Sequence, residues 1–337
     1  RAGEGVVALK GTDLEREVIE TLPADVTQTG AAALQAHLLH DIVRKLPDGA
    51  QITLESAGDG QRVQLSCGPS RFQLPALAAD EFPDITAGEM SHELELPAHE
   101  LRRLIEKARF AISTEETRYY LNGIYLHAAQ SSGKPVLRAV ATDGHRLAQV
   151  ELDCPPGADG MPGIIIPRKT VHEVHKLLEG SEAMVAIGLS TTRIQFRTGD
   201  VIMTSKLIDG TFPDYQRVIP QSNNKVMLVG NAEFAAAVDR VATVSTERGR
   251  AVKLNIQRDK LQLTVVNPDG GSATEEIAAE YDADPMEIGF NARYLLDISQ
   301  QLESPTVKLF LADSGSPTTV RDESDSGALY VLMPMRV

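Results

Sequence analysis

Aromatic side chains, cysteine and long apolar runs are all scarce in this sequence of 337 residues. Aromatic residues make up 4% of the chain and tryptophan is absent, so the cores must rest on Leu, Ile, Val and Ala. The two cysteines, Cys67 and Cys154, are far apart and lack metal-ligand spacing, which indicates a reducing compartment, the cytoplasm. No apolar run approaches the roughly 20 residues that a membrane-spanning helix needs, and residues 1–4 are not typical of a signal peptide. We therefore expect no membrane partner.

The charge balance is acidic, with 33 Lys and Arg against 47 Asp and Glu, a net charge of −14. By itself this argues against tight nucleic-acid binding, which depends on basic side chains displacing counterions from phosphates. The apolar content of 42% is typical of a folded protein, and the length fits two or three domains.

Short motifs recur along the chain with a period close to 130 residues, which indicates an internal repeat. The first and second copies share Thr12-Asp13 with Thr142-Asp143, and Phe82-Pro83-Asp84 with Phe212-Pro213-Asp214. A third copy is fainter, with Leu302-Glu303 following a helical stretch as Leu178-Glu179 does. The repeat predicts three domains, over residues 1–90, 91–219 and 220–337. The first unit is then shorter than the period by about 35 residues and lacks a first helix, so we expect it to be truncated at its N-terminus.

Apolar spacing predicts five helices, over residues 34–46, 97–113, 167–178, 231–245 and 291–302. Between them lie runs typical of β-strands, such as 63–65, 201–204, 261–265 and 307–311. Each unit thus alternates helix and strands. This pattern predicts an α+β fold in which helices cover one face of an antiparallel sheet.

Several ordered segments resemble the bacterial sliding clamps, the beta subunits of DNA polymerase III. They are Gly11-Thr12-Asp13-Leu14-Glu15, Arg118-Tyr119-Tyr120-Leu121-Asn122-Gly123, Ala141-Thr142-Asp143-Gly144-His145-Arg146-Leu147-Ala148, Pro167-Arg168-Lys169, Lys206-Leu207-Ile208-Asp209-Gly210, Phe212-Pro213-Asp214-Tyr215, Ile288-Gly289-Phe290-Asn291 and Tyr330-Val331-Leu332-Met333-Pro334-Met335-Arg336. Their order and spacing span nearly the whole chain.

The resemblance implies three clamp domains per chain and a homodimer, closed head to tail into a ring around double-stranded DNA. It implies no catalysis, no cofactor and no metal. The implied partners are DNA, held topologically and without sequence preference, the polymerase III alpha subunit, the clamp loader, and other polymerases and repair proteins with short linear motifs.

The acidic net charge is compatible with such a ring, because topology rather than affinity would hold it on DNA. The stretches 36–46, 97–112, 167–179, 231–248 and 291–303 contain 12 Lys and Arg against 10 Asp and Glu, a net of +2. A mildly basic lining with an acidic exterior suits sliding, since the outer charge is screened over roughly 8 Å at physiological salt.

The resemblance also implies a peptide-binding groove between the second and third units. Its expected residues are Arg118, Leu121, Thr142, Gly144, His145, Arg146, Leu147, Pro213, Arg217, Val218, Asn291, Tyr294, Val331, Leu332, Met333, Pro334, Met335 and Arg336. Apolar members would form a trough in which methionine adapts to different partners, while Arg146, Arg217 and Arg336 orient peptide carbonyls or acidic groups. Gly249, Gly315 and Pro317 depart from the family's pattern, which leaves the motif preference open.

Three alternatives stand beside this reading. Asp143 and His145 have the composition of a base dyad, although no nucleophile turn accompanies them and the repeated Thr-Asp is typical of a structural turn. Unit one lacks a counterpart of Gly144-His145-Arg146-Leu147, so we expect this segment to be specific to the second unit. The C-terminal run from Leu329 to Met333 is also compatible with an ordinary core strand. The chain as a whole is also compatible with a peptide-binding scaffold that never encircles DNA.

The DNA-facing residues implied by the family are Arg44, Tyr119, Tyr120, Arg168, Lys169, Lys176 and Arg240, each of which is equally compatible with a solvated surface. Glu115 and Glu116 make the loop before the tyrosines acidic, which argues against a phosphate contact there. The implied dimer interface joins Phe72 and Leu74 to Thr243 and Val244 of a second chain and so covers a strand edge. The alternative is that Phe72 and Leu74 enter the core of unit one.

Two histidine pairs, His37 with His40 and His172 with His175, have one-turn helical spacing. No third ligand is evident for either pair, whereas zinc sites take three or four. We therefore expect solvent-facing helix histidines and no metal.

Overall fold

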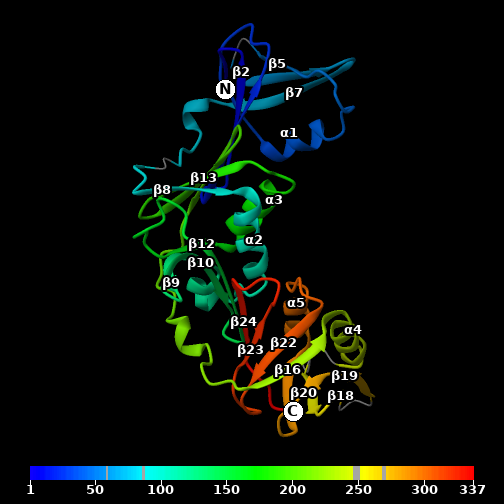
Figure 1. The fold of residues 1–337 in the computed structure, drawn as a ribbon. Coiled ribbons are helices and arrows are strands. Elements are labelled where there is room, and N and C mark those ends of the chain that lie inside the picture. Colours follow the sequence, from blue (N-terminus) through cyan, green and yellow to red (C-terminus); the bar gives the residue numbers. More distant parts are fainter. Residues whose placement is uncertain (58–59, 86–87, 246–250, 268–270) are drawn as a thin grey trace. The chain divides into compact units, whose positions relative to one another are not determined.

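The computed structural model describes residues 1–57, 60–85, 88–245, 251–267 and 271–337. The chain divides into two compact structural units, which differ from the three repeats of the sequence. The first contains residues Arg1–Ser91 and Val185–Lys206, and the second contains His92–Met184 and Leu207–Val337. No helix in the described ranges is long and apolar enough to cross a membrane. Figure 1 labels the elements in chain order.

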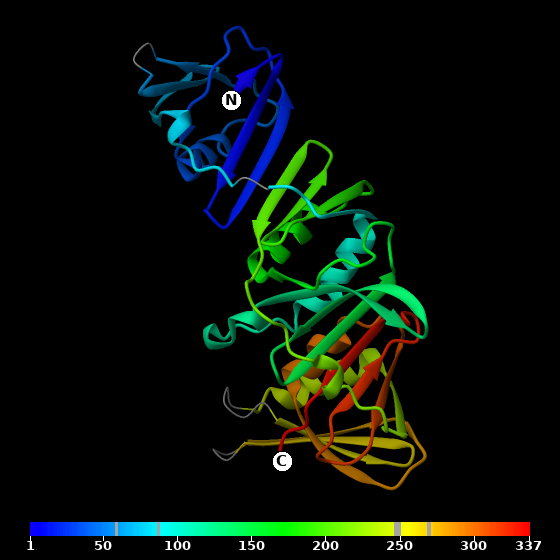
Figure 2. The same cartoon turned by 90° about the vertical axis from the view of Figure 1, so that its left-hand side faces the viewer.

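The first unit contains two antiparallel sheets and one helix. Strands β1 (Ala2–Gly3), β2 (Val6–Thr12), β3 (Arg16–Pro23), β15 (Val201–Lys206), β14 (Arg193–Thr198) and β13 (Met184–Leu189) follow one another in the larger sheet. The smaller sheet has the order β4 (Ala33–Leu34), β7 (Ser70–Leu77), β6 (Arg62–Cys67) and β5 (Thr53–Ser56). Helix α1 (Ala36–Val43) and the short helix η1 (Ala79–Glu81) complete it. Figure 2 shows β2 and β3 as the long blue hairpin.

Strand pairing in this first unit joins segments far apart in the sequence. Strand β15 pairs with β3 in antiparallel register, from Val201 opposite Glu20 to Ser205 opposite Arg16. The second copy of the repeat therefore continues the sheet that the first copy begins.

The second unit holds a sheet of nine strands and a sheet of four. The larger has the order β12 (Ile164–Pro167), β9 (Gly123–Ser131), β10 (Lys134–Thr142), β11 (Arg146–Asp153), β24 (Ala328–Leu332), β23 (Thr318–Arg321), β22 (Thr306–Leu311), β16 (Lys225–Gly230) and β20 (Glu280–Tyr281). The smaller has the order β19 (Gly271–Ala278), β18 (Lys260–Asn267), β17 (Ala251–Gln257) and β21 (Met286–Asn291). Strand β8 (His92–Pro97) belongs to neither of these two sheets, and the short helices η2 (Glu116–Leu121) and η3 (Tyr215–Val218) complete the unit.

The pairing of β11 with β24 joins the second and third copies of the repeat. Its register runs from Arg146 opposite Leu332 to Val150 opposite Ala328. Because β11 and β24 are neighbours in one sheet, side chains from residues 146–150 and 328–332 share its faces. The C-terminal strand is thereby placed beside the turn that precedes β11.

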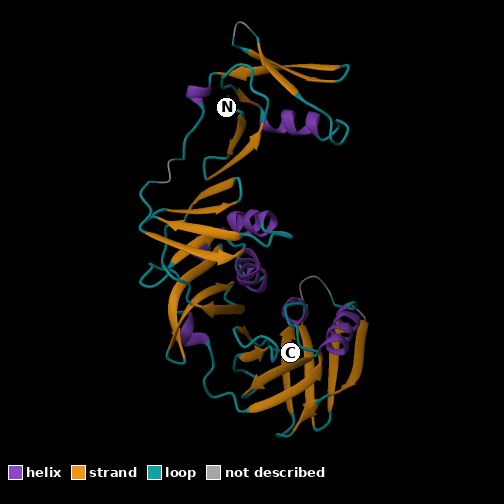
Figure 3. Cartoon of the chain, turned by 45° about the horizontal axis from the view of Figure 1, so that its top comes forward, coloured by secondary structure: helices purple, strands orange, loops and turns teal. Residues whose placement is uncertain are grey.

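The four helices of this unit pack in two pairs, α2 (Ala98–Arg109) with α3 (Arg168–Leu177), and α4 (Asn231–Ala242) with α5 (Ala292–Ser299). Each buries an apolar stripe, as α4 does with Phe234, Ala237, Val238 and Val241. Figure 3 shows α4 and α5 over one face of the strands. All five predicted helices form, and the α+β prediction is confirmed, although the helices are shorter than expected. They carry nine Lys and Arg and seven Asp and Glu, so the predicted net of +2 is retained.

A buried ion cluster fixes the loop before β24 to helix α2. Arg103 donates two hydrogen bonds to the Asp325 carboxylate, and Lys107 Nζ lies 2.7 Å from both Asp325 and Glu303 oxygens. The Asp322 carboxylate is fully buried and accepts from the backbone amides of residues 303, 304 and 324. Burial opposes the charged forms, yet the pairing lowers the pKa of Asp325 and raises that of Lys107.

Candidate functional site

The site is built on a hydrogen-bonded turn between β10 and β11. The Thr142 hydroxyl donates to the Arg146 carbonyl at 2.7 Å and accepts from the Gly144 amide at 3.1 Å. Asp143 Oδ1 accepts from the amides of His145 and Arg146 at 2.9 and 3.0 Å, and Oδ2 accepts from Arg146 Nε at 3.1 Å. These bonds explain the Thr-Asp motif as a structural turn.

The same turn occurs between β2 and β3, where Thr12, Asp13 and Arg16 repeat each of these bonds. Although burial opposes it, the hydrogen bonds from Arg16 lower the pKa of Asp13 to about 2. The expectation that unit one lacks the segment matching 144–147 was therefore wrong in part. Arg16 occupies the position of Arg146, and only the residues between Asp and Arg differ.

The third residue of each turn has left-handed backbone, with φ +87° at Gly144 and +72° at Leu14. Glycine adopts this conformation without the steric cost that leucine meets. At Gly144 it also leaves room for Arg118, whose Nη1 lies 2.6 Å from where a Cβ would stand. Arg118 in turn pairs with Glu115 at 2.6 Å, which lowers the Glu115 pKa.

Asp143 and His145 do not form a base dyad. The Asp143 carboxylate already accepts two backbone amides and the Arg146 guanidinium, and the His145 ring stacks near Tyr294 with centroids 6.4 Å apart. Neither side chain is arranged to activate the other.

The buried guanidinium of Arg146 joins three elements. Beside its bond to Asp143, Nη1 donates to Asp297 Oδ2 on α5 at 2.5 Å, and Nη2 donates to the Phe110 carbonyl after α2 at 2.6 Å. Its carbon lies 4.3 Å from the Tyr294 ring centroid and 5.1 Å from that of Phe110. Burial and Asp143 raise the Tyr294 pKa. Arg146 was expected to orient a ligand, and in the structure its Nε, Nη1 and Nη2 each donate to one of these internal acceptors.

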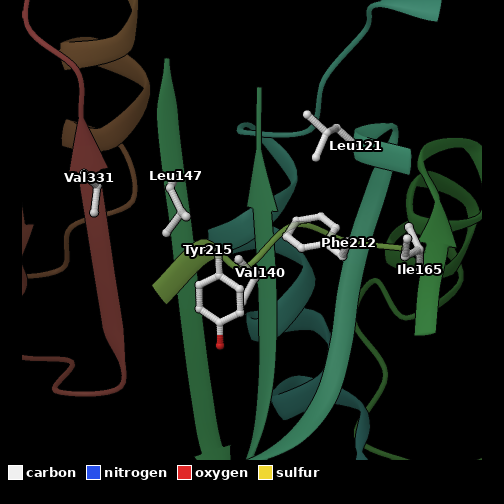
Figure 4. Close-up of a cluster of buried hydrophobic side chains, with 7 residues drawn as sticks. All are labelled: Leu121, Val140, Leu147, Ile165, Phe212, Tyr215 and Val331. Carbon is white, nitrogen blue, oxygen red and sulfur yellow. The ribbon is translucent and has the colours of Figure 1, made fainter. Parts of the chain in front are cut away.

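Apolar side chains from five separate segments meet at the nine-stranded sheet. Leu147 on β11 stands directly opposite Val331 on β24, and both are 2% exposed. The cluster comprises Leu121, Val140, Leu147, Ile165, Phe212, Tyr215 and Val331. Figure 4 shows the Phe212 and Tyr215 rings lying over these strands. The structure thus brings Leu121, Leu147 and Val331 together as expected.

Sequence reasoning missed Val140, Ile165, Phe212 and Tyr215 as cluster members. The Phe-Pro-Asp-Tyr segment had been noticed as part of the repeat and of the family resemblance, but only Pro213 of it was assigned to the groove. Its two aromatic residues are a signal for burial in a chain so poor in aromatics. The Phe212 ring stacks on Tyr125 with centroids 4.8 Å apart and planes 5° apart.

The Tyr215 hydroxyl anchors this segment to a polar network beneath it. His127 Nδ1 donates to the Ala128 carbonyl at 2.9 Å, so the neutral ring accepts from the Tyr215 hydroxyl through Nε2 at 3.0 Å. Arg138 donates to the same hydroxyl at 3.0 Å and to Glu151 at 2.9 Å. Burial lowers the His127 pKa and so favours the neutral ring.

Beside the buried cluster, several expected residues are exposed. Val218 is 47% exposed, Met333 39% and Met335 37%, and the amide of Met333 donates to the His145 carbonyl at 2.9 Å. Pro213, Arg217 and Arg336 are exposed, and Pro334 is half-buried. Leu332 is different, because it is 1% exposed and lies on the opposite face of β24 from Val331. It belongs to the inner core and not to this surface.

Asn291 is the N-cap of α5, and its side-chain oxygen accepts from the Arg293 amide at 2.9 Å. Of the departures from the family pattern, Gly315 is exposed and Pro317 half-buried, while Gly249 lies outside the described residues.

Comparison with known proteins assigns the whole chain. Residues 1–86, 95–214 and 216–336 match the N-terminal, central and C-terminal domains of the DNA polymerase III beta subunit. The chain belongs to the DNA polymerase III beta subunit family. It is 49% identical to the beta sliding clamp of Caulobacter vibrioides over 98% of this chain and 89% of that protein, and 36% identical to that of Escherichia coli over 100% and 90%.

Solved clamp structures are similar throughout. A sliding clamp from Bartonella birtlesii bound to griselimycin has a TM-score of 0.96 at 50% identity, covering 100% of this chain and 90% of that one. The clamp from Caulobacter crescentus has a TM-score of 0.95 at 48% identity, with the same coverage.

Membership of the beta sliding clamps settles the class of function. They are processivity factors of DNA polymerase III that encircle DNA as homodimeric rings and bind polymerase and other partners. The chain shares this function and is not an enzyme.

The expected DNA-facing residues are all at least partly exposed. In the second unit, the Arg168 amide at the start of α3 donates to the Asn122 carbonyl at 2.9 Å, which joins the start of α3 to the residue that follows η2. Arg240 pairs with Glu275 and Arg44 with Asp41, so neighbouring carboxylates offset both charges. Lys176 is exposed on α3.

Of the expected interface residues, Leu74 is 4% exposed and Phe72 is half-buried, which fits the alternative that Leu74 enters the core of its unit. Strand β7 pairs with β6 along residues 70–75, and with β4 only at Ala76 and Leu77. Thr243 and Val244 follow α4, with Thr243 exposed and Val244 half-buried.

The histidine pairs lie on helices, and His37, His40 and His172 are exposed. His175 is half-buried with Nε2 3.7 Å from Glu106, and burial lowers its pKa. Among the described residues, no group of three or more potential metal ligands is present.

Proposed function

We propose that the surface around Leu147 and Val331, with exposed Val218, Met333 and Met335 beside it, is the peptide-binding site of this clamp. Short linear motifs of the polymerase III alpha subunit, the clamp loader, and other polymerases and repair proteins are its proposed ligands. The observation that carries the proposal is the register of β11 and β24. It puts Leu147 opposite Val331 and leads directly into the exposed methionines.

The chemistry of this surface suits a ligand with apolar anchors. Val218, Met333 and Met335 are 37–47% exposed, so a peptide side chain that covers them removes apolar area from water. Each buried anchor should contribute roughly 1.5–3 kcal/mol, and two anchors with a few polar contacts give micromolar affinity. Methionine side chains adapt their shape, which fits several different partners.

Three arginines lie around the surface, of which Arg217 pairs with Asp214 at 2.8 Å and Arg118 with Glu115 at 2.6 Å. Arg217 is 84% exposed at its side chain, Arg336 is exposed, and Arg118 is partly exposed. The N–H groups that these pairs leave unused can donate to backbone carbonyls and acidic side chains of a peptide. Arg146 has the proposed role of holding the turn 142–146 against α5, since it bonds Asp143 of the turn and Asp297 of α5.

We further propose that Arg44, Tyr119, Tyr120, Arg168, Lys169, Lys176 and Arg240 face the encircled DNA. We also propose that Phe72 and Leu74 with Thr243 and Val244 form the contact between the two chains of the ring. We propose that the three clamp domains span residues 1–90, 91–219 and 220–337, and that the protein acts in the cytoplasm. The near-neutral helices support DNA binding by topology, because few contacts to phosphate are needed.

Deleting residues 333–337 tests the peptide site. Calorimetry with a short Gln-Leu-x-Leu-Phe-type peptide should give micromolar affinity for the unaltered chain and little binding after the deletion, because Met333, Met335 and Arg336 are removed. Dimerisation should be unchanged, since the proposed chain contact uses other residues. Val266→Ala is the matched control, as Val266 is an apolar residue exposed to 71% elsewhere in the same unit. Equal affinity before and after the deletion, in a protein with unchanged circular dichroism, would rule out the assignment.

A further inference from the structure

The C-terminal segment 333–337, which carries the exposed methionines, is held at two points. The Met333 amide donates to the His145 carbonyl at 2.9 Å, and the Met335 amide donates to the Gly289 carbonyl at 2.8 Å. The second bond is part of an isolated antiparallel bridge between Met335 and Gly289. The segment therefore lies as a strap between the turn 142–146 and strand β21.

Strand β21 stands at the end of the four-stranded sheet. On one side it pairs with β17, from Ala251 opposite Asn291 to Ile256 opposite Met286. On its other side, β21 forms one isolated backbone bridge among the described residues, between Gly289 and Met335. A strand edge with free amides and carbonyls is a ready support for an extended segment.

Gly289 is the residue on which the strap rests. A Cβ at this position would stand 2.7 Å from the Met335 carbonyl oxygen and 2.8 Å from Val337 Cγ2, and still closer to Val337 Cγ1. Separations this short do not occur for real Cβ atoms, so the strap would have to move. The backbone of Gly289 is not in the left-handed region. Glycine is therefore required here for space and not for conformation.

We propose that Gly289 is a positioning residue for peptide binding: by lacking a side chain it lets the strap lie directly on β21, and so sets Met333 and Met335 beside Leu147 and Val331. This inference rests on the proposed peptide site. Gly289 does not touch the peptide, and it acts through the placement of the strap.

Gly289→Ala in the full chain is the direct test. The added methyl group meets a backbone oxygen, and overpacking of this kind is costly, so the strap should leave β21. Affinity for the Gln-Leu-x-Leu-Phe-type peptide should fall about tenfold or more, with the dimer intact. Gly11→Ala is the matched control, because Gly11 also lies on a strand, has no left-handed backbone, and has no atom within 4 Å of its Cβ position.

Hydrogen exchange supplies a readout that loss of general stability would not move. In Gly289→Ala the Met335 amide should lose protection, while amides of the paired β17 keep theirs. Val337→Gly is a second variant that leaves β21 untouched and removes the side chain that packs over Gly289; it should weaken peptide binding severalfold and speed exchange at Met335.

The outcomes separate the two proposals. Unchanged peptide affinity and unchanged Met335 exchange in Gly289→Ala, with the unaltered chain binding normally, would overturn the role of Gly289 alone. Absence of binding by the unaltered chain would overturn the peptide site itself, and this inference with it.

Discussion

Replacing Asp325 by alanine should reveal how strongly the loop before β24 is tied to α2. The Asp325 carboxylate accepts two hydrogen bonds from Arg103 and one from the Gly327 amide at 3.1 Å, and lies 2.7 Å from Lys107 Nζ. The variant leaves Lys107, 7% exposed at its side chain, with the solvent-exposed Glu303 as its nearest remaining carboxylate.

The size of the effect follows from this geometry. Removing one partner of a buried ion pair costs about 3–5 kcal/mol, because the remaining charge stays buried. Arg103 is 29% exposed at its side chain and regains some hydration, which moves the expectation to the lower end, about 3 kcal/mol. Asp325→Asn should cost less, since the amide oxygen still accepts from Gly327 and Arg103.

Urea denaturation followed by circular dichroism measures the change in the free energy of unfolding. The matched control is Asp282→Ala, which breaks an ion pair to Arg258 whose side chains are 90% and 77% exposed. That pair should contribute nothing measurable. If Asp325→Ala costs no more than Asp282→Ala, the cluster does not hold β24 in place and the reasoning is refuted.

The remaining predictions concern pH and the Tyr215 network. Because the folded-state pKa of Asp325 is lowered, its contribution to the free energy of unfolding is present above about pH 4 and is lost as the pH falls through that pKa. Because the folded-state pKa of Lys107 is raised, its contribution to the free energy of unfolding is present up to about pH 10 and is lost as the pH rises through that pKa. The stability difference between the unaltered chain and Asp325→Ala should therefore be constant near neutrality and narrow at both extremes, which pH-dependent urea titrations measure. Tyr215→Phe should lower the free energy of unfolding by about 1–2 kcal/mol, because the His127 and Arg138 groups that bond the hydroxyl lose a partner. Tyr119→Phe, at a half-exposed ring, is the control and should leave the free energy of unfolding unchanged. Equal effects of the two substitutions on urea denaturation would contradict the network.

Local structure could be predicted well from this sequence. The stripe of Leu101, Leu104 and Ile105 indicates α2, and alternating residues such as those of 261–265 indicate β18, because periodicity reports burial of one face. Helix ends were overestimated, since apolar residues after Arg109 are buried without being helical.

Pairings between distant segments could not be predicted from local patterns. Strand β3 pairs with β15, and Arg103 meets Asp325 across 222 positions, because sheet order and burial bring them together. Local patterns gave no register for β11 and β24; the placement of Leu147 near Val331 came from the family resemblance.

The family resemblance grouped the residues of the proposed site, but it did not reveal the internal contacts that some of them make. Arg146 looked like a ligand-binding arginine, and its partners Asp297 and Phe110 become evident only when α5 and the end of α2 are placed. Leu332 was grouped with Val331, although alternation along a strand sends neighbours to opposite faces. No sequence pattern indicated the role of Gly289, because this role depends on the absence of a side chain.

The central claim, a clamp held on DNA by topology, is tested most directly by retention on circular and linear DNA. Protein loaded on nicked circular DNA should stay bound at moderate salt concentration. A net charge of −14 for the chain and of +2 for its helices leaves little electrostatic attraction for salt to weaken. Cutting the circle once should release the protein within the time that sliding to an end requires. Equal retention on circles and on linear DNA with unblocked ends would contradict the account.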